Sequence, residues 1–228
     1  MQMTYNSRFV VGIFKRELKN RFLCEVQIDN DDVVCYVPSS CHLSNFLQLE
    51  GKKVLLVATK TIGSRTPYAL FAVPYKRSYI ILNTSMANRA FENSIQRRCF
   101  SFLGGRKDII KEHTVDGYKT DLFLPVSNTI IEIKSIISIE DRAIFPTVYS
   151  ERTIYQLKTI YSMLLKGYRV CMAFVSLHPY VKNITIDSNT EFYTELVKCL
   201  DAGLILKAYT CRLQNDKVLI DKEICVEI

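Results

Sequence analysis

A segment near the middle of the chain, residues 118–135, concentrates the side chains whose types and spacing could carry chemistry. If residues 125–128 form a turn, the flanking strands pair with Asp121 opposite Glu132, and opposed residues have Cβ atoms about 4.5–5.5 Å apart. Strand alternation places Lys134 on the same face as Glu132. The apolar side chains point to the opposite face: Leu122, Leu124, Ile131 and Ile133. The hairpin therefore predicts two carboxylates and one ammonium group side by side.

Two carboxylates at that distance repel each other and raise each other's pKa unless a positive charge lies between them. A divalent cation is the natural candidate, because carboxylate and carbonyl oxygens are hard ligands that suit Mg²⁺ or Mn²⁺. Such a cation could polarise a phosphoryl oxygen and lower the pKa of a bound water, while Lys134 orients that water or stabilises charge. The same side chains are also compatible with a surface ion-pair cluster on an edge strand.

The hairpin resembles the signature of the PD-(D/E)xK nucleases, because ten residues separate Asp121 from Glu132-Ile133-Lys134. Around this signature, the chain is similar to the sugar fermentation stimulation protein A (SfsA) family over nearly its whole length. The stretches that carry the similarity are Arg21-Phe22-Leu23, Glu25-Val26, Asn83-Thr84, Asn88-Arg89, Lys119-Thr120-Asp121, Glu132-Ile133-Lys134-Ser135, Phe145-Pro146, Ser150-Glu151-Arg152, Ala208-Tyr209 and Cys211-Arg212. The resemblance implies an amino-terminal OB-like domain joined to a PD-(D/E)xK nuclease-like domain, DNA binding, and a role in expression of sugar-utilisation genes.

Carried over residue by residue, the resemblance gives catalytic roles to the hairpin. It implies that Asp121 and Glu132 are metal ligands and that the Ile133 carbonyl is a further ligand. It also implies that Lys134 positions the attacking water or stabilises charge in the transition state. Glu92, on a predicted helix, is the candidate additional catalytic carboxylate.

Basic residues near this site are candidate contacts to nucleic acid. Arg89 lies three positions before Glu92, so Glu92 is equally compatible with an i,i+3 ion pair to Arg89. Arg152 opens a predicted helix whose free N–H groups could meet a phosphate. Lys119 keeps the charge, but not the bidentate fork, of the Arg that the family usually carries. At positions 155 and 156 the chain has Tyr and Gln where basic residues are usual, which predicts weaker phosphate contacts there.

Residues 1–82 predict a small β-barrel domain. Short runs rich in Val, Ile, Phe, Tyr and Leu alternate with turn residues, among them Gly63-Ser64. Closely spaced strands cannot leave long edges exposed, so an OB-type barrel is expected. The expected strands are Phe9–Phe14, Arg21–Ile28, Val33–Val37, Lys53–Ala58, Tyr68–Val73 and Ser78–Leu82, with one helical stretch near Leu43–Leu49.

Most of the positive charge lies in this amino-terminal part. The chain holds 30 basic and 23 acidic residues, a net charge of +7, and residues 1–80 contribute +5 of it. A basic barrel suggests a groove that tracks a phosphate backbone. The candidate cations are Lys15, Arg16, Lys19, Arg21, Lys52, Lys53, Lys76 and Arg77. Phe14, Phe22 and Tyr75 could stack on bases or, alternatively, fill the barrel interior.

Residues 83–228 predict an α/β domain with a mixed central sheet flanked by helices. The expected helices are Met86–Gln96, Glu151–Lys166 and Thr190–Ala202. Ser150 can cap the second of these helices and Gly167 can end it. The strand Arg169–Leu177 is so apolar that helices should cover both of its faces. The other expected strands are Lys119–Leu124, Thr129–Ser135, Leu204–Arg212 and a short terminal strand after Lys217.

Composition and cysteine usage predict a cytoplasmic protein. No apolar run reaches the 18 or so residues that a bilayer span needs, and Met1–Arg8 does not resemble a signal sequence. The eight cysteines include no C-x-x-C pair, so reduced thiols are expected. The cysteines expected in buried, apolar strands are Cys24, Cys35, Cys171, Cys211 and Cys225.

Together these patterns predict a two-domain nucleic-acid-binding protein with a Mg²⁺- or Mn²⁺-dependent phosphodiesterase site that acts on DNA or RNA, and no membrane partner. Two alternatives stay open. One is a DNA-binding regulator of sugar utilisation in which the carboxylate cluster is only structural. The other is an adaptor whose barrel binds a protein partner.

Overall fold

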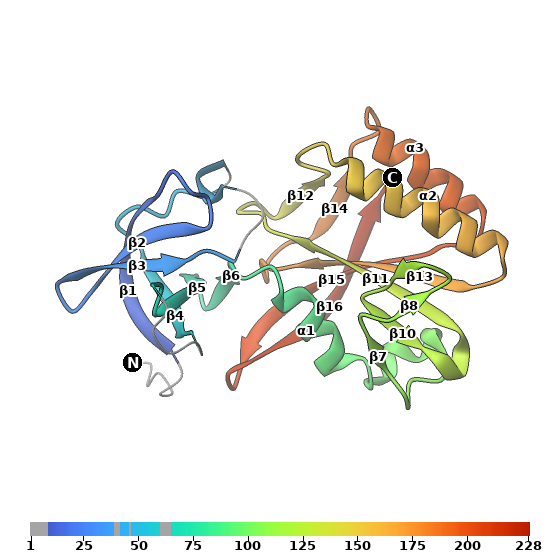
Figure 1. Cartoon of the computed structure of the whole chain (residues 1–228), viewed down its shortest axis with the longest axis horizontal. Coiled ribbons are helices and arrows are strands. Elements are labelled where there is room, and N and C mark those ends of the chain that lie inside the picture. The colour runs from blue at the N-terminus through green and yellow to red at the C-terminus, as the bar shows by residue number, and fades with distance from the viewer. Residues whose placement is uncertain (1–8, 39–41, 46, 60–64) are drawn as a thin grey trace.

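The computed structural model describes residues 9–38, 42–45, 47–59 and 65–228. The segment Met1–Arg8, where we expect no signal sequence, and the turn expected at Gly63-Ser64 lie outside the described residues. A smaller amino-terminal part stands beside a larger carboxyl-terminal part (Figure 1). Within the described ranges, no helix is both long enough and apolar enough to cross a membrane.

The amino-terminal part is a β-barrel. Its strands are β1 (Phe9–Glu17), β2 (Leu23–Ile28), β3 (Asp31–Tyr36), β4 (Lys53–Ala58), β5 (Tyr68–Tyr75) and β6 (Ser78–Ile81). They lie in the order β3-β2-β1-β4-β5-β6, and a bridge between Tyr36 and Ala69 joins β3 to β5. The helical stretch is shorter than expected, a 3₁₀ turn at Leu43–Asn45. The OB-type fold expected for this part is confirmed.

The three aromatic residues proposed for base stacking have different surroundings. Phe14 is only 4% exposed and belongs to the barrel core, so its stacking role is wrong and the core interpretation is right. The ring of Tyr75 packs against His178 of the carboxyl-terminal part, with centroids 4.8 Å apart. Phe22 is 38% exposed, and the Arg21 guanidinium lies 4.8 Å from the centre of its ring. Of the three, Phe22 keeps an accessible ring.

The carboxyl-terminal part is built on an eight-stranded mixed sheet. Its helices are α1 (Met86–Ser94), α2 (Glu151–Leu165) and α3 (Glu191–Asp201), with 3₁₀ turns at Arg98–Leu103 and Pro125–Ser127. Its sheet strands are β7 (Ile110–Lys111), β10 (Leu122–Leu124), β11 (Thr129–Ile136), β12 (Arg142–Phe145), β13 (Arg169–Ser176), β14 (Asn183–Ile186), β15 (Ile205–Gln214) and β16 (Lys217–Glu227). A separate hairpin pairs β8 (Thr114–Val115) with β9 (Tyr118–Lys119). The sheet order is β12-β14-β16-β15-β13-β11-β10-β7.

Helices cover both faces of this sheet, as the apolar strand predicts. Every residue of β13 after Arg169 is buried. One face packs against α1 and the 3₁₀ turn that follows it, and the other packs against α2 and α3. Figure 1 shows α1 below the sheet and the paired α2 and α3 above it. The expected α/β architecture with a mixed central sheet is confirmed.

The long helix α2 begins and ends as its sequence predicts. The Ser150 hydroxyl accepts a hydrogen bond from the Thr153 amide at 3.3 Å, which satisfies one free N–H of the first turn. Gly167 follows the helix with a φ of 88°, a left-handed conformation that favours glycine. These local signals place Arg152 in the first turn of α2.

Several expected boundaries are wrong. The helix α1 ends at Ser94, two residues early, and a 3₁₀ turn follows. The terminal strand is not short, because β16 has 11 residues that pair with β15 and then with β14. The strands β12 and β14 were not expected, since four-residue strands carry too little alternation to detect. Cys225 is exposed on β16, unlike the other cysteines expected in buried strands.

The hairpin register agrees with the sequence. Leu122 pairs with Ile131 and Leu124 with Thr129, which is the register that opposes Asp121 to Glu132. The turn is the 3₁₀ segment Pro125–Ser127 followed by Asn128, whose φ of 48° is left-handed. The apolar side chains of the hairpin point to the α1 face of the sheet.

The two parts share a core. Barrel residues such as Phe71 and Ile81 belong to the same buried cluster as α1 and the central strands. The Ile81 amide donates to the Leu177 carbonyl at 2.9 Å across the boundary. Barrel and sheet are therefore packed as one body, and His178 lies in their contact region.

We expect His178 to make stability depend on pH. Burial lowers the pKa of His178, and its Nδ1 accepts a hydrogen bond from the Tyr180 amide at 3.1 Å. As pH falls below about 6.5, the unfolded chain takes up a proton that the folded chain resists, so stability falls by at most about 1.4 kcal/mol per pH unit. Urea unfolding between pH 7.5 and 5.5 should show a shallower loss in His178→Gln. An identical pH dependence in both proteins contradicts this prediction.

Candidate functional site

Asp121 lies just before β10 and is held from two directions. Its Oδ2 accepts a hydrogen bond from the Ile133 amide at 2.7 Å, across the hairpin. Its Oδ1 accepts one from Asn88 Nδ2 at 2.9 Å, from α1. The amide and carbonyl groups of one residue point to the same edge of a strand. The Ile133 carbonyl therefore faces the edge at which Asp121 lies.

Glu132 lies on β11 and is almost completely buried, with 3% of its surface exposed. Its Oε2 accepts a hydrogen bond from the Tyr118 hydroxyl at 2.6 Å. Its Oε1 accepts from Lys134 Nζ at 2.9 Å and from Gln156 Nε2 at 3.0 Å. Because β11 is an internal strand of the sheet, the alternative of a surface ion-pair cluster on an edge strand is wrong.

Lys134 is held between two elements. Its Nζ contacts Glu132 Oε1 and also donates to Gln156 Oε1, on α2, at 2.6 Å. Its side chain is largely buried, so the ammonium group has few other conformations open to it. An ammonium group fixed in this way is already positioned to stabilise negative charge that develops beside it during a reaction.

The pKa of Asp121 is shifted in the direction expected for two carboxylates that lie close together. Burial raises the pKa of Asp121, and the negative charge of Glu132 raises it further, while the bonds from Ile133 and Asn88 oppose the rise. Burial and the same Glu132 carboxylate raise the pKa of Tyr118, so this hydroxyl stays protonated and donates. A positive charge beside Asp121 would relieve the unfavourable energy of its ionised form.

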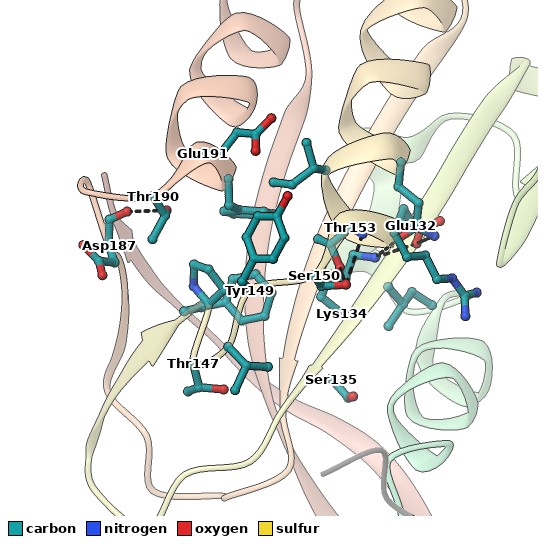
Figure 2. A pocket seen from close by; sticks show the side chains of 18 of the residues that line it. Glu132, Lys134, Ser135, Thr147, Tyr149, Ser150, Thr153, Asp187, Thr190 and Glu191 are labelled. Carbon is teal, nitrogen blue, oxygen red and sulfur yellow. Dashed lines mark hydrogen bonds and ion pairs between the residues drawn. The ribbon is translucent and has the colours of Figure 1, made fainter.

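These residues form one wall of a cavity of about 1040 Å³. Its lining includes Asp121, Glu132, Lys134 and Gln156 at one end, and it continues past the first turn of α2 to the first turn of α3. Figure 2 shows Glu132 and Lys134 on one side of Ser150, and Asp187, Thr190 and Glu191 on the other. The cavity is large enough for a ligand that contacts both ends.

Only some of the predicted site residues come together here. Arg152 and Lys119 line the cavity, and Lys119 Nζ is paired with Glu112 Oε2 at 2.5 Å. Glu92 is not among the lining residues, and its carboxylate pairs with Lys111 and not with Arg89. Arg89 is exposed on α1.

The predicted cations of the barrel lie away from this cavity. Lys15 Nζ lies 3.8 Å from Asp32 Oδ1, and Arg16 Nε lies 3.0 Å from Glu25 Oε2. Arg21 packs over Phe22 as described above. Ion pairs of this exposed kind contribute little to stability.

Sequence reasoning missed three residues that hold the site. Gln156 follows Arg152 by four positions, so helical spacing on α2 could have placed it on the same face. Tyr118 and Asn88 carry no local signal for contact with Glu132 and Asp121, because their partners lie 14 and 33 positions away. Thr120, which lines the cavity, has a buried hydroxyl without a hydrogen-bond partner among the described residues.

The residues present fit a hard divalent cation. Asp121 and Glu132 offer carboxylate oxygens, and the Ile133 carbonyl faces the same edge. Both Asp121 oxygens and Glu132 Oε2 accept one hydrogen bond each, which orients them and leaves a further lone pair, whereas Glu132 Oε1 already accepts two. Within the described residues, no group of three or more His, Cys, Asp or Glu side chains is placed to hold a metal. Any such site would therefore be completed by backbone or solvent oxygens.

Two family profiles match nearly the whole chain. The "SfsA N-terminal OB domain" matches residues 17–82, and the "Sugar fermentation stimulation protein RE domain" matches residues 85–217. This chain belongs to the SfsA family. The OB match covers the barrel strands β2 to β6, and the RE match covers the cavity and all of its carboxylates.

The relatives that are named as SfsA homologs have low sequence identity to this chain, but the matches extend over most of both chains. A sugar fermentation stimulation protein homolog from Caldanaerobacter subterraneus subsp. tengcongensis is 28% identical over 215 residues, covering 92% of this chain and 93% of that protein. One from Methanobrevibacter smithii is 26% identical over 218 residues, covering 89% and 90%. SfsA of Pyrococcus furiosus, solved in complex with Ca²⁺, matches with a TM-score of 0.83 at 22% identity and covers 100% of both chains. At that identity, the match shows a common fold.

Proposed function

We propose that this SfsA-family chain binds DNA and hydrolyses phosphodiester bonds with the help of Mg²⁺ or Mn²⁺. The observation that carries the proposal is the buried cluster of Asp121, Glu132 and Lys134 in the wall of a cavity of about 1040 Å³. Buried charges are costly, and a cluster of this kind is more typical of a functional site than of a stabilising contact.

Different residues of the chain would bind the cation, stabilise charge and contact the phosphate. Asp121, Glu132 and the Ile133 carbonyl would hold the cation, which supplies a Lewis acid and a bound water of lowered pKa. Lys134, held by Gln156, stabilises negative charge at the reacting phosphate. Arg152, in the first turn of α2, contacts a phosphate oxygen of the strand. The Ca²⁺ in the Pyrococcus furiosus SfsA complex supports an affinity for oxygen-bound cations.

A direct assay tests this function. Purified protein is incubated with end-labelled single-stranded DNA, double-stranded DNA and RNA in Mg²⁺, Mn²⁺ or EDTA. We expect cleavage in at least one metal and none in EDTA, and we expect Asp121→Asn to abolish it. Cleavage that persists in Asp121→Asn would have to come from another site or from a contaminant.

A second function is favoured by the names of the relatives. They are called sugar fermentation stimulation protein homologs, which is compatible with a DNA-binding regulator of sugar utilisation that does not cleave DNA. The Lys134 ammonium already donates to Glu132 and Gln156, which is compatible with a purely structural cluster. Tight DNA binding by wild type without cleavage in any metal would favour this regulator.

We expect binding to DNA to weaken steeply with salt. Each phosphate that the basic barrel neutralises contributes about −0.9 to the slope of log affinity against log salt. Arg21→Ala should make that slope shallower by about 1, measured by fluorescence anisotropy of labelled DNA. Lys182→Ala is the control, because Lys182 lies in the carboxyl-terminal part and pairs with Asp141. A flat salt dependence in wild type would favour the protein-binding adaptor.

A further inference from the structure

We propose that the end of the cavity away from Lys134 takes one unpaired nucleobase of the bound strand, stacked on the ring of Tyr149. The inference rests on the proposed function, and it specifies the substrate class as a strand with at least one unpaired base. The end concerned, called the distal end below, is lined by Thr147, Val148, Tyr149, Asp187, Thr190 and Glu191.

The geometry separates the distal end from the carboxylate cluster. Figure 2 shows Ser150 between the two, with Tyr149 between Ser150 and Thr190, which precedes α3. Both ends belong to one cavity of about 1040 Å³. Pockets for small ligands typically have about 300–1000 Å³, so a phosphate group at the cluster leaves room for a base at the distal end.

Tyr149 has the form of an unused stacking platform. Tyr149 is 69% exposed although it lines a cavity, and Val148 beside it is 59% exposed. The Lys158 ammonium, which pairs with Glu191, also interacts electrostatically with the Tyr149 hydroxyl, so the face of the ring is left to a ligand. By contrast, Phe145 and Phe192, which also line the cavity, pack on each other with centroids 5.0 Å apart. An exposed aromatic ring over an apolar floor fits a flat, partly apolar group.

The charges of the distal end select a base over a phosphate. Asp187 and Glu191 place carboxylates at this end. Lys158 Nζ lies 3.0 Å from Glu191 Oε1 and balances its charge, so Asp187 supplies most of the negative charge that would repel a phosphate. The same carboxylates accept hydrogen bonds from the exocyclic amino group of cytosine and from equivalent groups of adenine and guanine. Thymine and uracil have no such amino group. The distal end therefore favours bases that carry an amino group, and the phosphate lies near Arg152 and Lys134.

A base paired in a duplex cannot stack on Tyr149 without leaving its partner. Single-stranded substrates already present unpaired bases, so they avoid the free energy of unpairing. We therefore expect a lower KM for single-stranded DNA than for the same sequence as a duplex. The stacking interaction should change KM about 5-fold to 150-fold.

A double-mutant cycle between protein and substrate tests the contact. The substrates are 5′-labelled 12-nucleotide single strands, intact or with one abasic site scanned along the strand, in Mn²⁺. With wild type, one abasic position should raise KM strongly. Tyr149→Ala should raise KM for the intact strand by a similar factor and show no further loss at that position. Tyr149→Phe keeps the ring and should behave as wild type.

The control is Tyr155→Ala, because Tyr155 is 70% exposed on α2 and does not line the cavity. It should leave every KM unchanged. Equal KM values for wild type and Tyr149→Ala on intact and abasic strands overturn the inference, as does an equal KM for single strand and duplex. If wild type cleaves none of the substrates, the proposed hydrolysis is wrong. The Kd of each protein for each strand is then measured in Ca²⁺, and the same double-mutant cycle is calculated from the Kd values. Coupling in Kd then supports the base site, and its absence overturns it.

Discussion

Replacing Lys134 by alanine is expected to lower kcat about 100-fold to 1,000-fold and to leave KM nearly unchanged. The reason is that the Lys134 ammonium is held 2.9 Å from Glu132 Oε1 and 2.6 Å from Gln156 Oε1, so it stands ready before the substrate binds. A preorganised charge contributes mainly in the transition state, where negative charge on the phosphate grows. Steady-state cleavage of labelled DNA measures both constants.

The control for this variant is Lys111→Ala. Lys111 is also paired with a glutamate, Glu92, but it does not line the cavity. It should leave kcat within a factor of about 2, as expected for a surface residue outside the site. A metal-stimulated activity that survives both Lys134→Ala and Glu132→Ala would remove this cluster from the mechanism.

Replacing Asp121 by alanine is expected to lower the affinity for Mn²⁺ by more than about 100-fold. Loss of a residue that only orients a ligand typically costs about 10-fold to 100-fold in metal affinity, and the loss of a ligand itself costs more. Isothermal titration calorimetry measures the affinity, and the rise in Tm on adding Mn²⁺ provides a second measurement.

Two comparisons separate lost binding from lost folding. Burial and Glu132 raise the pKa of Asp121, so its ionised form destabilises the metal-free fold at neutral pH. The metal-free Asp121→Ala protein should therefore stay folded, as circular dichroism can verify. Glu112→Ala is the matched control, because Glu112 lines the same cavity but pairs with Lys119. Equal Mn²⁺ affinity in wild type and Asp121→Ala would move the metal site elsewhere.

The sequence alone determined the hairpin and the two-part architecture. Alternating apolar residues and the Pro125 turn predict a register with period 2, and a slip by one residue would expose the whole apolar face. The structure has that register, with Leu122 opposite Ile131. Ser150 and Gly167 mark the ends of α2 through local hydrogen bonding and backbone conformation. Such signals act within a few residues and can be recognised without the fold.

Only the tertiary structure decided which residues meet at the site. Asn88, Tyr118 and Gln156 reach the carboxylates because α1, the β8–β9 hairpin and α2 pack around one edge of β11. Packing also directed Glu92 to Lys111 and placed Phe14 in the barrel core while Phe22 stayed accessible. These outcomes depend on how separate elements cross and on which faces they bury. A periodic pattern specifies the buried face of each element, but the partner of that face is set by the assembled fold.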